Sequence, residues 1–363
     1  MNIYDTFKDI IVTPDNFKID KDYLLKVHNN NQYNNVILNY YARYEKEGKN
    51  ISRNKIKSIS SCNKYFNIDR YDYNLVKDYK RTNLCKDKFC NNCKKVKQAA
   101  RMSKYIPELE PYADKLYHLT LTIPNVTGSE LKSTIKIMSK AFSRLMDYIK
   151  GKQILSFYDF KRFGYLGSIR SLEITFNGDN YHPHYHCCFA FNNLDLNKTI
   201  KNKYSIDYYH KKEDKLFSEF EITVQKIWYL LINKMRVCEE NFNILEDGYS
   251  CNCDKFQEGD YKQLFKYMTK ETDENKNVLT YDNFKVLYDS TFGIKQIQGY
   301  GCFYNITDSD LDDEVDKMYC DIVNLLKEDE DPTSTFETPL ELLNDDRYLL
   351  ISRKKVFQYL KEL

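Results

Sequence analysis

The stretch LEITFNGDNYHPHYHCCFAF, residues 172–191, predicts two strands joined by a turn, because apolar-rich segments flank the turn-forming residues NGD. It holds three of the six histidines in the chain. Successive side chains of a strand point to opposite faces, so His182, His184 and His186 would share one face. Three imidazoles on one face favour a metal site, and a polar edge strand with its histidines in water is the alternative.

The surrounding sequence extends this hairpin into a sheet layered with helices. Alternating residues predict strands, and apolar residues at helical spacing predict the helices between them. The predicted strands cover residues 116–125, 165–177, 182–191 and 292–306, and the predicted helices cover residues 129–150, 217–235 and 260–272. A strand, a helix and then paired strands predict an α+β fold.

Composition divides the chain into four segments. They are a polar, Asn-rich and partly ordered lead-in (1–60), a basic cysteine-rich element (61–104), the sheet-containing domain (105–305) and an acidic C-terminal region of two amphipathic helices (306–363). Residues 77–104 carry ten Lys or Arg against two Asp, whereas residues 306–346 carry fifteen acidic residues against two Lys. The basic block favours a polyanionic partner, and a solvated face is the alternative for each run.

The chain also carries signals about its compartment. No apolar run reaches the roughly 18 residues of a membrane span, and the N-terminus lacks the basic and then apolar plan of a signal peptide. We therefore expect a cytoplasmic protein without a membrane partner. In that compartment the eleven cysteines are expected to be thiols or metal ligands rather than a disulfide framework.

The cysteine-rich element predicts a structural zinc site. Cys85, Cys90 and Cys93 have C-x4-C-x2-C spacing, and the x2 pair lets two thiolates reach one tetrahedral ion. Cys62 is our choice for the fourth ligand, and Cys251, Cys253 and His118 are the alternatives. The neighbouring basic residues suit contact with phosphates; the candidates for DNA binding are Lys94, Lys95, Lys97 and Arg101.

A metal on His184 and His186 needs a third protein ligand. If the two halves of the hairpin pair across the turn, Glu173 on the first strand reaches the histidine face. His and carboxylate ligands with open positions suit Mg²⁺, Mn²⁺ or Zn²⁺, and a divalent Mg²⁺ or Mn²⁺ is our expectation. His182 is expected to be a fourth ligand or a general acid.

A nucleophile is suggested by the segment YKQLFKYMTKETD, residues 261–273. Tyr267 differs from most of the thirty-two tyrosines because Lys266 flanks it and Lys270 lies one turn further on in the predicted helix. Two cations would hold a phosphate and favour the phenolate of a group whose ordinary pKa is about 10.

Three of these segments together resemble a known family. LYHLTLTIPN, HPHYHCCFAF and YKQLFKYMTKETD are similar, in order and kind, to the three motifs of rolling-circle replication initiators of small bacterial plasmids, within the HUH endonuclease superfamily. The cysteine cluster and GIKQIQGYGCF resemble flanking blocks of that family. The resemblance covers about residues 62–306.

The resemblance implies a fold and a reaction. It implies a five-stranded antiparallel sheet of RNA-recognition-like topology, with the histidine strand central and the tyrosine on an overlying helix. Residues 105–305 would then be a nicking and strand-transfer domain. Tyr267 would cleave one strand of a single-stranded or hairpin origin and keep a 5′-phosphotyrosine link. His184, His186 and Glu173 would hold the metal. Lys270 would lie at the scissile phosphate or at the metal site.

One departure from the family concerns Gln263, where some plasmid initiators carry a glutamate one turn before the tyrosine. Glutamine cannot act as a general base. Glu258, Glu271 or Asp273 would substitute for it, or a homodimer would supply a second tyrosine. No phosphate-binding loop of an ATPase occurs in the sequence, so strand separation is expected to depend on a host helicase and polymerase.

The main hypothesis is therefore a metal-dependent DNA nickase that initiates rolling-circle replication. Within the superfamily, a one-tyrosine transposase is the rival, whereas relaxases commonly place the tyrosine before the histidine motif. A zinc-dependent nucleic-acid-binding protein without catalysis, in which the histidines are structural, belongs to a different class. A hydrolase that uses metal-bound water would keep its activity without Tyr267.

Overall fold

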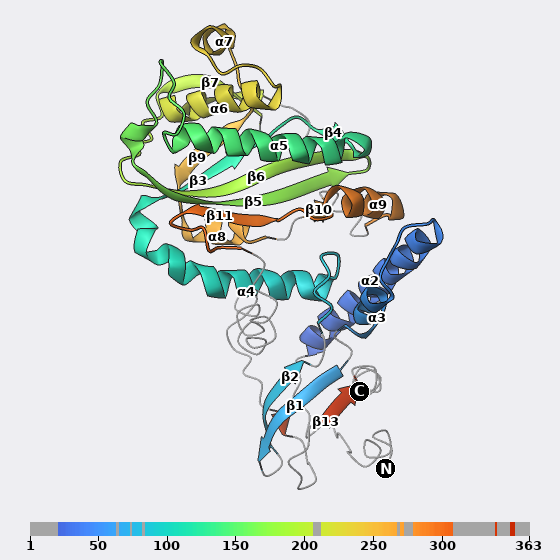
Figure 1. Cartoon of the computed structure of the whole chain (residues 1–363). Helices are drawn as coiled ribbons and strands as arrows, with labels where there is room; N and C mark the ends of the chain where they lie inside the picture. The colour runs from blue at the N-terminus through green and yellow to red at the C-terminus, as the bar shows by residue number, and fades with distance from the viewer. Residues whose placement is uncertain are drawn as a thin grey trace. The chain divides into compact units, whose positions relative to one another are not determined.

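The computed structural model divides the chain into two compact units, each with its own sheet (Figure 1). The first unit combines Met1–Ala100 with Asp310–Leu363, and the second is Arg101–Ser309. The division falls within helix α4 (Asn91–Leu109). The described residues are 21–62, 65–72, 75–81, 84–205, 212–266, 269–271, 279–307, 338–339 and 349–352.

The first unit contains two helices in the segment expected to be a partly ordered lead-in. They are α2 (Lys21–Lys46) and α3 (Arg53–Ser61). Among the side chains of α2 that the structure describes, from residue 33 onward, the buried ones recur every three or four positions: Asn34, Ile37, Tyr41 and Tyr44. This stripe carries two tyrosines and an asparagine, which conceal its helical period from a simple hydrophobicity pattern.

A four-stranded antiparallel sheet completes the first unit, in the order β12-β2-β1-β13. Its strands are β1 (Tyr65–Asp72), β2 (Leu75–Arg81), β12 (Thr338–Pro339) and β13 (Leu349–Ser352). Strand β13 lies in the segment where the sequence predicts the last helix, and it pairs with β1. Most of the other residues between 308 and 363 lie outside the described ranges.

The second unit is built on a sheet in which β6 is central. The strand order is β5-β6-β3-β9, and the free side of β5 pairs with β11 along one part and with β10 along another. The bounds are β3 (Leu116–Leu121), β5 (Tyr165–Asn177), β6 (Asn180–Phe191), β9 (Cys251–Lys255), β10 (Thr269–Glu271) and β11 (Ile297–Gly301). All pairs are antiparallel except β10 with β5. The predicted hairpin and the central histidine strand are therefore confirmed.

Helices cover both faces of this sheet (Figure 1). On one face lie α5 (Gly128–Ile149), α6 (Glu219–Ile232) and α9 (Tyr281–Ser290), and on the other lie η1 (Glu110–Lys115) and α8 (Glu258–Leu264). Tyr185 of β6 packs on Phe142 of α5 and Trp228 of α6, with ring centroids 5.5 Å and 6.3 Å away. Because neighbouring strand residues face opposite ways, His184 and His186 are directed away from α5 and α6.

Several short elements connect the main ones. They are β4 (Val126–Thr127), η2 (Lys161–Phe163), the hairpin of β7 (Ile200–Ser205) and β8 (Lys212–Phe217), and α7 (Glu239–Ile244). No helix among the described residues is long and apolar enough to cross a membrane.

The predicted helix 260–272 is wrong in its second half. Helix α8 ends at Leu264, and Thr269–Glu271 forms strand β10. The backbone of β10 pairs with Ile174, Thr175 and Phe176 of β5, beyond the end of β11. This long-range pairing outweighs the local helical period, so Lys266 and Lys270 do not lie one turn apart on a shared helix.

Candidate functional site

The paired strands β5 and β6 bring Glu173, His184 and His186 together. Glu173 lies directly opposite His184 across the hairpin. Its Oε2 lies 3.0 Å from Nε2 of His186 and 3.4 Å from Nε2 of His184. The ligand atoms of all three lie within 4.8 Å of one another, so the group could hold a metal ion.

The protonation states of this group suit a divalent cation. Burial raises the pKa of Glu173, but hydrogen bonds from His184 and His186 outweigh it and hold the pKa below its ordinary value. Burial also lowers the pKa of His186 to about 4, against the opposite influence of Glu173. An ionised carboxylate beside a neutral imidazole is the donor state that a metal requires.

Both histidines present Nε2 to the site because their other ring nitrogen is engaged. Nδ1 of His184 lies 3.1 Å from the backbone carbonyl of His182. Nδ1 of His186 lies 3.1 Å from Nε2 of His118 on β3. In the metal-free protein the Nε2 atoms donate to Glu173. A bound metal would replace these protons, so that Nδ1 carries the proton and Nε2 gives its lone pair to the ion.

The pair of His118 and Asp260 was not predicted as part of this site. Nδ1 of His118 lies 2.9 Å from Oδ1 of Asp260 on α8. Burial raises the pKa of Asp260, but the hydrogen bond from His118 lowers the pKa and is among the contacts that outweigh burial. The pKa of this carboxyl is therefore held below its ordinary value. The chain Asp260–His118–His186 fixes the ring of a candidate ligand. Strand alternation alone could have placed His118 on this face, whereas nothing in the sequence indicates Asp260.

His182 is not brought into the ligand group. Among the described residues, the metal-competent set at this site is Glu173, His184 and His186. His182 contributes its carbonyl rather than its ring, which orients His184. The roles expected of the His182 ring, a fourth ligand or a general acid, stay predictions.

Tyr267 and Met268 lie outside the described residues, as does the side chain of Lys270. Lys266 precedes them, and its Nζ donates to Oε1 of Gln263. Thr269 follows them and pairs with Ile174, the neighbour of Glu173. The two described ends of this short gap are thus both tied to the second unit, one of them beside the metal-ligand strand.

Arg101 differs from its predicted role in phosphate binding. Only 2% of it is exposed. Its guanidinium donates to the carbonyl oxygens of Phe265 and Lys266 and to the side chain of Gln296. A buried guanidinium in these contacts is not placed on the surface for DNA. Lys94 and Lys97 are half-buried on α4, and the side chain of Lys95 is not described.

The four predicted zinc ligands form a cluster in the first unit. The Sγ atom of Cys62 lies 3.6 Å from those of Cys90 and Cys93, and the sulfurs of Cys85 and Cys93 are 3.5 Å apart. A tetrahedral zinc with Zn–S bonds of about 2.3 Å requires sulfurs about 3.8 Å apart. The geometry therefore fits zinc, and Nδ2 of Asn34 adds a hydrogen bond of 3.1 Å to Cys90.

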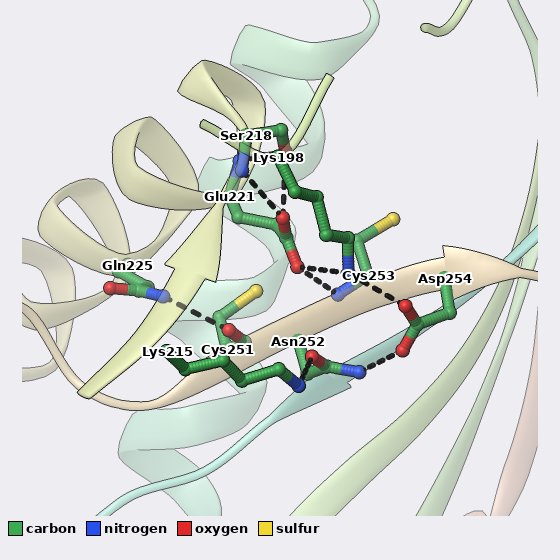
Figure 2. Close-up of polar contacts among 9 residues, drawn as sticks. All are labelled: Lys198, Lys215, Ser218, Glu221, Gln225, Cys251, Asn252, Cys253 and Asp254. Carbon is green, nitrogen blue, oxygen red and sulfur yellow. Dashed lines mark hydrogen bonds and ion pairs between the residues drawn. The ribbon is translucent and has the colours of Figure 1, made fainter. Parts of the chain in front are cut away.

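The alternative ligands Cys251 and Cys253 belong to a structural network at the outer strand β9 (Figure 2). Burial raises the pKa of both thiols. The fully buried Glu221 accepts hydrogen bonds from the backbone nitrogens of Ser218 and Cys253, both at 2.8 Å, and from Lys198 at 3.1 Å. This network fastens β9 to α6 and so supports its neighbour β3, which carries His118.

A central antiparallel sheet with a Glu-His-His group, preceded in the sequence by a four-cysteine cluster, agrees with the rolling-circle replication proteins that the sequence resembles. The family model described as "Replication protein" matches residues 76–343, and the chain belongs to this family of plasmid replication proteins. The match contains every residue of the Glu-His-His group and begins after Cys62.

Curated relatives agree with this assignment. The chain is 25% identical to "Protein rep" of Bacillus amyloliquefaciens over 280 residues, which is 74% of this chain and 76% of the relative. It is 30% identical to "Protein rep" of Streptococcus pneumoniae serotype 2 over 138 residues, or 36% of this chain, and spans 40% of that relative. A "Protein rep" from Bacillus sp is 31% identical over 153 residues, covering 40% of this chain and 47% of the relative. No solved structure matches the chain.

Proposed function

We propose that this protein initiates rolling-circle replication by nicking one DNA strand with Tyr267. The observation that supports this most is the group of Glu173, His184 and His186, because Ile174, the neighbour of Glu173 on β5, pairs with Thr269, two residues after Tyr267. A nucleophile and a metal group so linked suit transfer of a phosphoryl group.

In the proposed reaction, the phenolic oxygen of Tyr267 attacks the scissile phosphorus. The bond from phosphorus to Tyr267 forms as the bond to the 3′ oxygen breaks. The proton lost by the phenol balances the proton gained by the leaving oxygen, so the products are a 5′-phosphotyrosine and a free 3′-hydroxyl. A host polymerase would extend that hydroxyl, with strand separation by a host helicase.

Each site residue has a proposed task in this step. Glu173, His184 and His186 would hold a divalent Mg²⁺ or Mn²⁺ through Oε2 and the two Nε2 atoms. When bound, the ion polarises a phosphoryl oxygen, a contribution on the order of several kcal/mol. Lys270 would contact the scissile phosphate, and Lys94, Lys95 and Lys97 would contribute a salt-sensitive attraction for the DNA backbone. The zinc held by Cys62, Cys85, Cys90 and Cys93 would stabilise the first unit.

Termination requires a different solution from a glutamate before the tyrosine, because Gln263 accepts a hydrogen bond from Lys266 and cannot remove a proton. A second copy of the chain could supply a second tyrosine, which would make the working form a homodimer. Nearby carboxylates such as Glu258 are the alternative.

The test uses purified protein with Mn²⁺ and a labelled, randomised pool of single-stranded and hairpin oligonucleotides. Adducts that survive denaturation are isolated and their DNA is sequenced. The proposal expects a metal-dependent adduct that is lost in Tyr267→Phe and in the double mutant His184→Ala/His186→Ala. Cleavage that persists in Tyr267→Phe would assign the chemistry to a hydrolase. DNA binding without any adduct would favour a zinc-dependent binding protein. An initiator and a one-tyrosine transposase would both form the adduct, and the DNA sequence that is cleaved separates them.

A further inference from the structure

The buried side chains of Arg101 and Gln296 form hydrogen bonds with the backbone immediately before Tyr267. Nη1 of Arg101 donates to the carbonyl oxygens of Phe265 and Lys266, at 3.3 Å and 3.1 Å. Nε2 of Gln296 donates to the same carbonyl of Lys266 at 2.6 Å. Nη2 of Arg101 donates to Oε1 of Gln296 at 2.9 Å, which closes the arrangement.

Gln296 also connects these hydrogen bonds to β5, the strand that carries the candidate ligand Glu173. Its backbone carbonyl accepts a hydrogen bond of 3.0 Å from the nitrogen of Leu172, the residue before Glu173. On the other side of Glu173, Ile174 pairs with Thr269. The backbone on both sides of residues 267–268 is therefore tied to β5 on both sides of Glu173.

The Arg101 guanidinium is well suited to the C-terminal end of α8. The carbonyl groups at the C-terminal end of a helix lack partners within the helix and carry a partial negative charge. The Arg101 guanidinium supplies both a cation and a fork of donors at this position. Both Arg101 and Gln296 are more than nine-tenths buried, so water competes little with these hydrogen bonds.

We propose that Arg101 and Gln296 are positioning residues that hold the segment bearing the nucleophile in register with Glu173 and its two histidines. This inference rests on the proposed role of Tyr267. Arg101 and Gln296 act through the backbone of Phe265 and Lys266 and do not touch DNA. A misplacement of about 1 Å between a nucleophile and its target lowers a rate by about 100-fold.

The amide of Gln296 is essential to this role because it accepts from Arg101 and donates to Lys266 at the same time. A glutamate at this position would still accept from Arg101 but would have no donor for the carbonyl of Lys266. Gln296→Glu therefore separates positioning from stability: it preserves the contact with a buried cation and removes the contact with the nucleophile segment.

A second buried glutamine provides the matched control. Nε2 of Gln225 on α6 donates to the backbone carbonyl of Cys251 at 3.0 Å (Figure 2). Like Gln296, it is buried and its amide donates to a backbone carbonyl, but it lies on the face of the sheet away from the histidines. Gln225→Glu repeats the chemical change without touching the residues next to Tyr267.

The experiment measures the single-turnover rate of adduct formation at saturating Mn²⁺, on an oligonucleotide selected from the random pool by wild-type protein. Gln296→Glu is expected to slow this rate by about 100-fold, with the Mn²⁺ affinity, the DNA affinity and the melting temperature close to wild type. Gln225→Glu is expected to melt at a lower temperature and to keep the wild-type rate. Arg101→Lys, which keeps the charge but not the fork, is expected to slow the rate as well.

The outcomes separate this inference from the proposed function. Adduct formation that survives Tyr267→Phe, or no adduct with wild type, removes the proposed function and this inference with it. Loss in Tyr267→Phe together with a wild-type rate in Gln296→Glu overturns the positioning role alone. If Gln296→Glu does not fold, Gln296→Met, which removes both polar contacts without adding a charge, is compared with Gln225→Met. Equal rates in that pair also overturn the positioning role.

Discussion

The two metal-competent groups of this protein differ in the number and the kind of their ligands. In the first unit, four sulfurs lie 3.5–3.6 Å apart for the three measured pairs, which leaves a tetrahedral ion no free position. In the second unit, one carboxylate and two imidazoles form the group. Three ligands leave open positions for water or a phosphoryl oxygen. Ligand number and softness, rather than burial, therefore distinguish the two groups.

Loss of one cysteine of the cluster is expected to destabilise the protein more than any other change discussed below. Cys90→Ser is expected to abolish zinc binding and to unfold the first unit, because a structural zinc supplies on the order of 10 kcal/mol of apparent folding free energy. Zinc content by mass spectrometry and circular dichroism melting would show this loss. The double mutant His184→Ala/His186→Ala is the control, and it should keep its zinc. A Cys90→Ser protein that retains zinc and melts at the wild-type temperature would contradict a structural role for the cysteine cluster.

The histidine site is instead expected to make the folding stability depend on pH. The pKa of His186 is lowered from 6.5 to about 4 by burial, so the unfolded chain binds a proton that the folded chain does not. Stability is then greatest above pH 6.5, falls as the pH drops towards 4 and does not fall further on this account, a loss of about 3 kcal/mol. The depressed pKa of Glu173 acts in the same direction at lower pH.

Urea unfolding of metal-free protein between pH 4 and 7.5 measures this dependence, with fluorescence of Trp228 as a probe of the second unit. His186→Gln should flatten the curve between pH 6.5 and 4, because residue 186 then has no imidazole to titrate. The groups around His186 are Glu173, His184 and His118. An unchanged slope in His186→Gln would assign the dependence to one of those neighbours.

A smaller effect is expected from His118, which touches a candidate ligand without belonging to the metal group. His118→Ala should weaken Mn²⁺ binding by about 10-fold to 100-fold, because His186 loses the contact that fixes its ring. Isothermal titration calorimetry measures the affinity, and zinc content serves as the internal control. An unchanged Mn²⁺ affinity would show that His186 is oriented by Glu173 alone.

The sequence reveals the cysteine site more completely than the histidine site, because the contacts that support the histidine site come from distant parts of the chain. The spacing of Cys85, Cys90 and Cys93 is local, and strand alternation together with a hairpin is enough to bring Glu173 to His184 and His186. The supporting contacts are not local. Asp260 reaches His118 only because α8 packs on the sheet.

Contacts between distant parts of the chain also explain two wrong predictions from the sequence. Residues 269–271 have a helical period but form β10, because a free part of the β5 edge accepts them. Arg101 looks like one more cation in a basic block, yet the fold buries it against the end of α8. Long-range packing decides such positions, and local patterns do not report it.

The smallest effect concerns the charge of Asp260, and it tests why His118 holds its position. Asp260→Asn keeps an oxygen that can accept from Nδ1 of His118 but removes the negative charge. A hydrogen bond to a charged group exceeds a neutral one by about 1 kcal/mol, so Mn²⁺ affinity should fall only about fivefold. A loss as large as that in His118→Ala would mean that the amide turns its nitrogen to His118 and reverses the proton order along the chain to His186. A side-chain amide has two orientations and a carboxylate has none to choose between, so the comparison of these two variants determines whether charge or geometry orients the ligand.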